Sequence, residues 1–265
     1  VIQSLMLVLA LVLGWGAQVR ANDTITIGTG TSSTYNTPYN HYYNNGWTEL
    51  RYDASEVGQP GIINGIAFNV AGAHSVTFTE FNVYMGMANS GTISGTTGWT
   101  PANELTLVYS ATNEVHGAST GWEWVEFDTP FAYNDPTKAL VVVVANKVSS
   151  YSSSLTYYFT NTTDHMLHHR SDTDPTYFNH PGTASGTTSA QRANIKLDMA
   201  PMSGDFCYPV SGLTATVVDS YNANLTWTDN HNGTSWLVQY STTPFTPDAA
   251  SATAVSSTSY ALTGL

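Results

Sequence analysis

The residues best suited to bind a ligand are the aromatic side chains between positions 35 and 47. They stand among Asn, Thr, Pro and Gly, and they are Tyr35, Tyr39, His41, Tyr42, Tyr43 and Trp47. Rings exposed on a loop can stack on the faces of sugars, and neighbouring Asn side chains can exchange hydrogen bonds with sugar hydroxyls. Tyr35, Tyr39, Tyr42, Tyr43 and Trp47 are therefore the candidate carbohydrate-binding loop. The interpretation that we favour for the cluster is that Tyr42 and Trp47 pack over one end of a β-domain and the other rings are solvated turn residues.

Two histidines and two aspartates, His165, His169, Asp172 and Asp174, are secondary candidates for a metal site. His165 and His169 share a face in a strand and lie one turn apart in a helix, so either geometry could bring both imidazoles to one metal ion. The two aspartates, with Asn179, could instead supply oxygen ligands to calcium. The sequence has no HExxH motif, no cysteine pair and no complete EF-hand loop. We therefore expect exposed or packed histidines and no required cofactor, with calcium as the ion to consider.

The third candidate is an acidic segment. Glu123 lies between Trp122 and Trp124, and Glu126 and Asp128 follow them. Glycoside hydrolysis needs two carboxylates that face each other across a cleft, one of them with a raised pKa. Alternation places Glu126 and Asp128 on the face of the two tryptophans. Surface acids on an outer strand face are far commoner than catalytic pairs, so we predict no catalytic residue.

The elements that must position these groups are strands. Alternating apolar and polar runs, separated by turn residues, begin at Ile62, Val76, Leu105, Trp122, Ala139, Leu155 and Ala193. Several strands at this spacing, without a long helical pattern between them, favour an all-β, jelly-roll-like β-sandwich. The continuous apolar run from Val141 to Val144 predicts a central strand that is buried on both faces.

The carboxy-terminal part has a second alternating pattern. In the stretch LTWTDNHNGTSWLVQYS the alternating large side chains are Leu225, Trp227, Trp236, Val238 and Tyr240. This pattern resembles the fibronectin type III family, an immunoglobulin-like sandwich of seven strands in two sheets. The resemblance implies that Trp227 and Trp236 lie in the core. It also implies that further strands follow Leu265, so that this sandwich is incomplete here and has one exposed sheet edge.

The amino terminus predicts a secretory signal. The apolar run from Leu5 to Ala17 is too short to span a bilayer, and Val19 and Ala21 are small residues suited to a cleavage site. We assign residues 1–21 to a signal peptide. A short amino-terminal membrane anchor is the alternative.

The remaining chain divides into a β-sandwich module at 22–200, a linker at 201–206 and the incomplete fibronectin type III domain at 207–265. The linker lacks periodicity and carries Pro and Gly. Cys207 is the sole cysteine and cannot form a disulfide within this chain, so the partner of Cys207 is left open.

Composition excludes several classes of protein. The chain has 265 residues, 42% of them hydrophobic and only 10% charged, and its formal net charge is -12. Enough apolar residues are present to build cores, so the chain is not disordered. The negative charge opposes binding to nucleic acid, because that binding draws on cationic contacts to phosphate. After cleavage of the signal we expect no membrane span.

The larger module also resembles a known type. The succession FNVYMG, LTLVYS, GWEWVEFDTPFAYN, LVVVVAN and ANIKLDM, before a cysteine and a fibronectin type III pattern, resembles a β-sandwich of secreted multimodular surface proteins of the Bacteroidota. The resemblance covers most of residues 24–200 and rests on core strands and turns. It implies an extracellular adhesive or ligand-binding unit and supplies no site residues.

The sequence therefore predicts a non-catalytic, secreted or cell-surface protein that binds glycans or proteins of a host or cell surface. The alternative is an accessory region of a larger secreted hydrolase, a glycosidase or a protease, whose catalytic domain lies outside this sequence.

Overall fold

A computed structural model describes residues 8–13, 23–201, 210–229, 236–241 and 252–264. The chain forms two compact units. The large unit comprises residues 20–202, and the small unit comprises residues 1–19 and 203–265. The predicted linker residues 202–206 and Cys207 lie outside the described residues.

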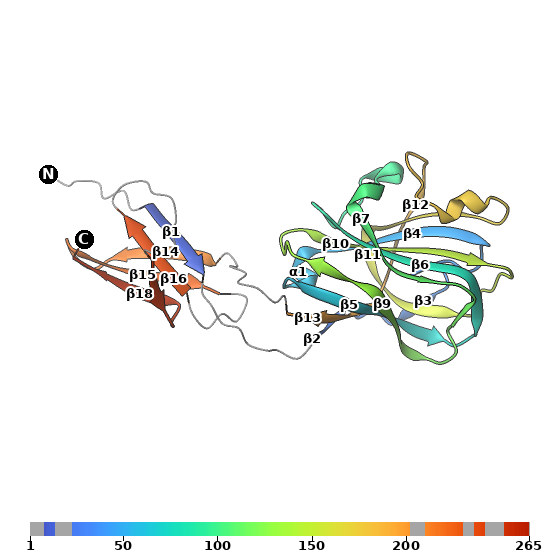
Figure 1. The fold of residues 1–265 in the computed structure, drawn as a ribbon, viewed down its shortest axis with the longest axis horizontal. Coiled ribbons are helices and arrows are strands. Elements are labelled where there is room, and N and C mark those ends of the chain that lie inside the picture. Colours follow the sequence, from blue (N-terminus) through green and yellow to red (C-terminus); the bar gives the residue numbers. More distant parts are fainter. Residues whose placement is uncertain (1–7, 14–22, 202–209, 230–235, 242–251, 265) are drawn as a thin grey trace. The chain divides into compact units, whose positions relative to one another are not determined.

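The large unit is built almost entirely from antiparallel strands (Figure 1). They are β2 (Asp23–Ile27), β3 (Ser32–Thr34), β4 (Asn45–Tyr52), β5 (Gly61–Gly72), β6 (Val76–Ala88), β7 (Leu105–Ala111), β8 (Glu114–His116), β9 (Gly121–Tyr133), β10 (Ala139–Val148), β11 (Thr156–Ser171), β12 (Thr187–Ala193) and β13 (Ile195–Ala200). The helical segments are short: α1 (Ala54–Val57), η1 (Gly95–Thr97), η2 (Ala102–Glu104) and η3 (Pro175–Phe178). This all-β composition confirms the predicted fold class.

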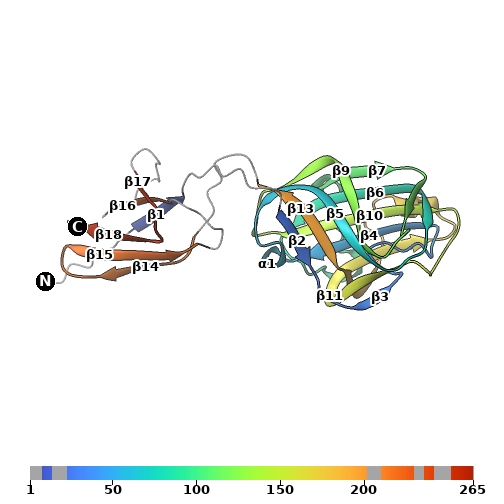
Figure 2. The ribbon, with the colours of Figure 1, turned by 90° about the horizontal axis from the view of Figure 1, so that it is seen from below.

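The strands pair in the order β2-β13-β5-β11-β4-β10-β6-β7, with β9 on β5, β3 and β12 on β11, and β8 on β6. β5 and β11 meet only where Thr156 and Tyr157 pair with Gly72 and Val70. The sheet turns at this narrow junction into two layers. Strands β2, β13, β5 and β9 form one layer, and β11, β4, β10, β6 and β7 form the other (Figure 2).

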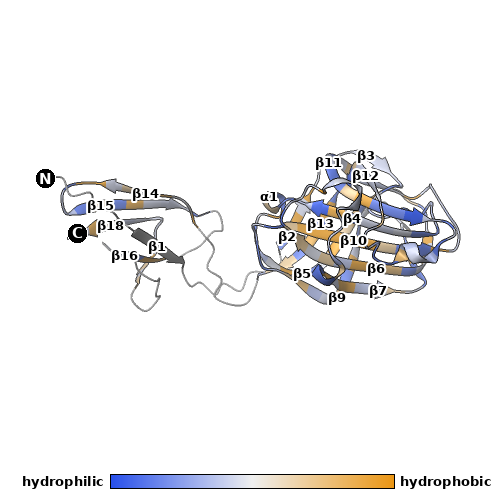
Figure 3. Ribbon diagram, turned by 90° about the horizontal axis from the view of Figure 1, so that it is seen from above, coloured by the Kyte–Doolittle hydropathy of each residue, from blue (hydrophilic) through white to orange (hydrophobic). Residues whose placement is uncertain are grey.

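The core of the large unit lies between the two layers. It is a single cluster to which Ile66 and Phe68 of β5 contribute from one layer and Val142 and Val144 of β10 from the other. Figure 3 shows this concentration of hydrophobic residues inside the large unit. The cluster supplies the apolar burial that stabilises the sandwich.

Strand β10 confirms the prediction of a central strand buried on both faces. It pairs with β4 on one side and β6 on the other, and Leu140 to Val144 are all fully buried. Val142 and Val144 face the main core, whereas Val141 and Val143 face a second cluster on the outside of this layer.

The second cluster is covered by two long connections, residues 89–104 and 172–186. They are bound to each other, because the Trp99 indole N–H donates to the Ala184 carbonyl at 2.8 Å and the Gly186 N–H donates to the Thr96 carbonyl at 2.6 Å. These connections thus form a cover over the outer face of β4, β10 and β6.

The small unit holds two three-stranded sheets. One contains β14 (Ser211–Val217), β15 (Asn222–Thr228) and β18 (Ser259–Thr263), and the other contains β1 (Val8–Leu13), β16 (Trp236–Ser241) and β17 (Thr253–Val255). Its core cluster includes Trp227 and Trp236, whose ring centroids lie 6.0 Å apart. Both tryptophans are therefore core residues, whereas Tyr240 is 38% exposed.

The middle of the predicted signal peptide forms strand β1 in this structure. Val8–Leu13 pairs antiparallel with Trp236–Ser241 along all six residues. The assignment of residues 1–21 as a cleaved signal stays a prediction, and cleavage would remove the β16 neighbour that this segment supplies.

Candidate functional site

The five aromatic residues predicted to form one binding loop lie in three different places. Tyr39 is fully buried in the main core, with its ring centroid 5.2 Å from that of Phe78 and 5.1 Å from that of Phe81. Its hydroxyl is hydrogen-bonded to that of Tyr157. The expectation of an exposed stacking ring is therefore wrong for Tyr39, because the loop after β3 inserts this side chain between the two layers.

Trp47 belongs to β4 and not to the loop. It is 2% exposed and points to the covered outer face, where its ring centroid lies 5.1 Å from Tyr84 and 5.4 Å from His180. The prediction placed Trp47 at the end of a loop because Asn, Gly and Tyr precede it. Strand β4 begins at Asn45, and pairing with β10 and β11 keeps this polar stretch extended.

The other three residues do come together. Tyr42 contacts Tyr35 and Tyr43 at centroid distances of 5.6 and 5.7 Å, and it also contacts Tyr151 at 5.4 Å. We call Tyr35, Tyr42, Tyr43 and Tyr151 the tyrosine patch. Tyr42 is 41% exposed and Tyr151 is 67% exposed, whereas Tyr35 and Tyr43 are partly buried. Tyr151 is the member that sequence reasoning missed, since it lies more than a hundred residues away in a serine-rich turn.

A chain of amide hydrogen bonds fixes the loop that carries the patch. The Tyr42 N–H donates to Oδ1 of Asn40 at 2.9 Å, and the Asn40 amide donates to Oδ1 of Asn36 at 2.9 Å. The Asn36 amide donates in turn to Gln191 of β12 at 3.1 Å. The Ser152 N–H donates to the His41 carbonyl at 3.0 Å, which holds the turn of Tyr151 beside the loop. These bonds join segments distant in sequence and hold the rings in fixed places.

Arg170, near the end of β11, lies against the patch. Its guanidinium stands 5.2 Å from the centroid of the Tyr43 ring, a cation–π distance. One terminal nitrogen donates to Oδ1 of Asn36 at 3.2 Å and the other to Nε2 of His168 at 2.8 Å. Burial, together with the charge of Arg170, lowers the pKa of His168 to about 3. His168 is therefore neutral at ordinary pH and acts as an acceptor for Arg170.

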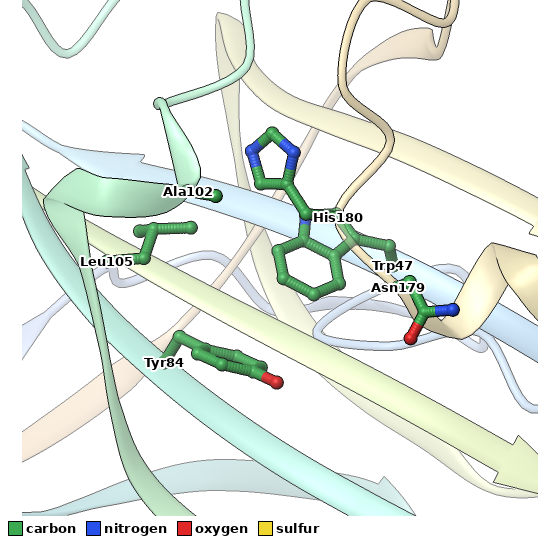
Figure 4. Close-up of a pocket in the computed structure, with 6 residues that line it drawn as sticks. All are labelled: Trp47, Tyr84, Ala102, Leu105, Asn179 and His180. Carbon is green, nitrogen blue, oxygen red and sulfur yellow. The ribbon is translucent and has the colours of Figure 1, made fainter.

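A small pocket lies on the covered outer face (Figure 4). Its volume is about 130 Å³, and it is lined by Trp47, Tyr84, Ala102, Leu105, Asn179 and His180. Both nitrogens of His180 already have partners, because Nε2 lies 2.7 Å from the Thr100 carbonyl oxygen and Nδ1 accepts from the Gly182 N–H at 3.0 Å. The indole N–H of Trp47 is buried without a partner. The pocket thus offers two aromatic walls but few free polar groups.

The four candidate metal ligands are used separately. His165 lies 3.2 Å from Asp53 through Nε2, and His169 stacks on Tyr177 with centroids 3.6 Å apart. Oδ1 of Asp172 accepts from the Asn44 N–H at 3.3 Å, whereas Oδ1 of Asp174 caps η3 by accepting from the Thr176 N–H. Within the part of the chain that the structure describes, no three His, Cys, Asp or Glu side chains are grouped to hold a metal ion. Calcium binding stays a prediction.

The acidic strand β9 directs its carboxylates to opposite sides. Glu126 and Asp128 are exposed on the outer face with Trp124, as alternation predicts. Glu123 points inward, and its carboxylate lies 3.5 Å from Nδ1 of His116. These carboxylates therefore do not face each other across one cleft.

His116 is the centre of a buried polar network that the sequence did not reveal. It lies between Glu114 and Glu123, and Glu123 also accepts hydrogen bonds from the Gly117 N–H and the Tyr157 hydroxyl. Burial opposes protonation of His116, but the hydrogen bonds and charges of the two carboxylates outweigh it and raise the pKa to about 9. No local pattern marks this network, because Glu123 and Tyr157 come from other strands.

Comparison with known proteins identifies no family. No protein-family profile and no curated protein sequence matches the chain. Among solved structures, the chain is similar to the cysteine protease and lectin-like domains of Cwp84, a surface layer associated protein of Clostridium difficile. The identity is 12% and the TM-score 0.36, and the match spans 60% of this chain and 32% of that one. At that TM-score the likeness supports no functional assignment. Among the described residues, no helix has the length and apolar character to cross a membrane.

Proposed function

We propose that the large unit is a non-catalytic, extracellular binding module that holds a glycan on the tyrosine patch. The observation that carries this proposal is the arrangement of rings around Tyr42, with Tyr42 and Tyr151 strongly exposed. A contiguous aromatic surface exposed to water is a common mark of a recognition site. Its rings offer faces for stacking on sugars, and its hydroxyls can bond sugar hydroxyls.

The surroundings of the patch suit a polar, ring-shaped ligand. Asn36 and Asn44 border the tyrosines, and both are partly exposed. Each amide nitrogen uses one N–H within the protein, to Gln191 and to the Asp172 carbonyl respectively, and so has a second N–H that can donate to a sugar hydroxyl. The loop is held by its own hydrogen bonds, so binding requires little ordering of side chains, which favours affinity.

The pocket on the outer face is a less suitable glycan site. A volume of about 130 Å³ is below the range of roughly 300–1,000 Å³ usual for small-molecule sites. Both nitrogens of His180 are also engaged by the protein, so the polar groups left in the pocket are the buried Trp47 indole N–H and the Asn179 amide. We therefore place the glycan on the patch.

We propose that the small unit is a fibronectin type III-like spacer. Strands β14, β15 and β18 pair in that order in one sheet, and β16 belongs to the other. In an immunoglobulin-like sandwich the first and second strands lie in one sheet and the third strand lies in the other, and β14, β15 and β16 are distributed in the same way. In a surface protein such a unit presents the binding module. In an accessory region of a larger hydrolase, the same patch would hold the enzyme on its polymeric substrate.

A glycan array probed with the chain and two variants tests the proposal. Tyr42→Ala and Tyr151→Ala each remove one exposed ring, and we expect each to weaken binding about tenfold, which corresponds to about 1.4 kcal/mol of stacking. Trp124→Ala is the matched control, since Trp124 is 40% exposed and lies on β9, away from the patch. Failure of the chain to bind any glycan, or an equal loss with the control, would refute the proposal.

A further inference from the structure

We propose that the tyrosine patch selects glycans that bear a carboxylate, and that Arg170 is the group that pairs with it. This inference rests on the proposed function, because it assigns the chemical class of the sugar held by the same patch. It comes from an arginine whose protein partners leave its charge without a counter-ion.

The described arginines differ in their partners. Arg51 pairs with Glu49 at 2.9 Å, and Arg192 pairs with Glu56 at 2.6 Å. Among the described residues Arg170 forms no ion pair with a carboxylate, and its two hydrogen bonds go to neutral groups, the amide of Asn36 and the imidazole of His168. The chain holds nineteen Asp and Glu residues, so the supply of acids does not explain this difference.

The nearest acidic residue along the chain is used elsewhere. Asp172 stands two residues after Arg170, and its carboxylate accepts the backbone N–H of Asn44 at 3.3 Å. The Arg170 guanidinium is partly buried between protein groups that cannot neutralise it. A partly buried charge without a counter-ion costs free energy, and an anion from a ligand would offset that cost.

Arg170 also has hydrogen-bonding capacity to spare. A guanidinium carries five N–H donors, and Arg170 uses one on Asn36 and one on His168. Its two terminal nitrogens have these partners, whereas its Nε is not among the described buried polar atoms that lack a partner. The donors that the protein does not use are the ones that can form the paired hydrogen bonds that arginine makes with a carboxylate.

The position of the guanidinium fits a sugar that lies on the patch. It stands over the Tyr43 ring, which contacts Tyr42, the ring at the centre of the patch. A carboxylate directly attached to a sugar ring would bind Arg170 while the ring itself stacks on the neighbouring tyrosines. The ligand class is thus an acidic sugar such as a uronic or sialic acid residue.

The test compares carboxylated oligosaccharides with their carboxyl-reduced counterparts. Oligosaccharides of galacturonic, glucuronic, mannuronic and sialic acid are each titrated into the whole chain beside the same compound with its carboxyl reduced to an alcohol. We expect at least one acid to bind ten to one hundred times more tightly than its reduced form. This comparison needs no variant, so it does not depend on the folding of any mutant.

Variants then assign the preference to Arg170. Arg170→Gln should bring the ratio of the affinities for the acid and reduced forms close to one, whereas Arg170→Lys should keep part of the preference, because it retains the charge without the paired donors. Equal binding of acid and reduced forms, an equal preference for a sulfated neutral oligosaccharide, or a preference unchanged in Arg170→Gln would overturn the inference and leave the glycan proposal in place. Binding of neither form of any sugar would overturn both.

Discussion

At the scale of single residues, His116 makes the stability of the large unit depend on pH. The pKa of His116 is raised to about 9 from an ordinary value of 6.5. Burial would raise the pKa values of Glu114 and Glu123, but bonding to His116 and other donors outweighs it and lowers both. The histidine thus contributes stability that is complete below pH 6.5 and disappears as the pH rises through about 9. The carboxylates contribute stability above their ordinary pKa values that disappears as the pH falls through the lowered ones.

We therefore predict that the large unit is most stable in a narrow range around pH 6.5, because burial lowers the pKa values of His168 and His41 to about 3 and about 4, and the stability of these neutral histidines is lost as the pH falls below 6.5. Thermal unfolding followed from pH 4 to pH 10 would show the melting temperature falling on both sides of this range. His116→Gln should flatten the fall between pH 6.5 and 9. A basic limb that is equally steep in this variant would show that His116 does not cause it.

Only part of the tyrosine patch could be predicted from the sequence. Tyr35, Tyr42 and Tyr43 could be recognised as a group because they are close in sequence and are set among turn residues. Tyr39 has the same local surroundings and yet is fully buried, since the loop turns inward at that residue. Tyr151 and Arg170 join the patch through contacts between distant segments, which no local pattern contains.

At the scale of elements, the cover over the outer face depends on one ion pair in β4. Glu49 is fully buried and accepts hydrogen bonds from the N–H and the hydroxyl of Thr100. Arg51 donates to the carbonyls of Gly98 and Ser90 in the same connection. This pair therefore attaches residues 89–104 to the sheet.

Glu49→Ala should destabilise the large unit by about 3–5 kcal/mol, because it leaves the buried guanidinium of Arg51 without its carboxylate. Denaturant unfolding measures this change. The control is Glu80→Ala, which breaks the more exposed ion pair with Lys147 and should cost at most about 1 kcal/mol. Equal losses in the two variants would contradict the role given to the Glu49–Arg51 pair.

The strands could be predicted from the sequence where both the spacing of the apolar residues and the composition favour a strand. The alternating runs of β5, β6 and β9 and the apolar run of β10 mark those strands clearly. Strand β4 and the second half of β11 are rich in Asn, Thr, His and Arg, and their polar side chains are buried under the cover or in the network at the patch. Such strands are stabilised by tertiary partners, so local propensity does not reveal them.

At the scale of the whole molecule, the two units have separate cores, and the amino terminus belongs to the small one. Strand β1 occupies the β16 edge through six paired residues. Removal of residues 1–21 should therefore expose this edge and lower the melting temperature of the small unit, with the large unit unchanged. Calorimetry of the chain from Val1 and of the chain from Asn22 compares the two. An unchanged transition of the small unit would show that β1 adds nothing to its stability.

The predicted signal peptide gives a second test at this scale. If residues 1–21 direct secretion, the protein exported by a bacterial host begins at Asn22, and mass spectrometry of the exported chain shows this directly. An exported or membrane-bound chain that keeps residues 5–17 would favour the anchor.

The net charge of -12 further predicts no measurable affinity for duplex DNA at physiological salt.

The central claim is that the tyrosine patch binds a glycan, and the most direct test is a chemical-shift map. The ¹⁵N-labelled chain is titrated with the sugar that it binds best on the array, and the shifted amides are assigned. We expect shifts centred on residues 35–44, on Tyr151 and on Arg170, with little change around Tyr84 and His180. Shifts centred on the Tyr84 and His180 pocket, or no sugar that shifts the patch, would contradict it.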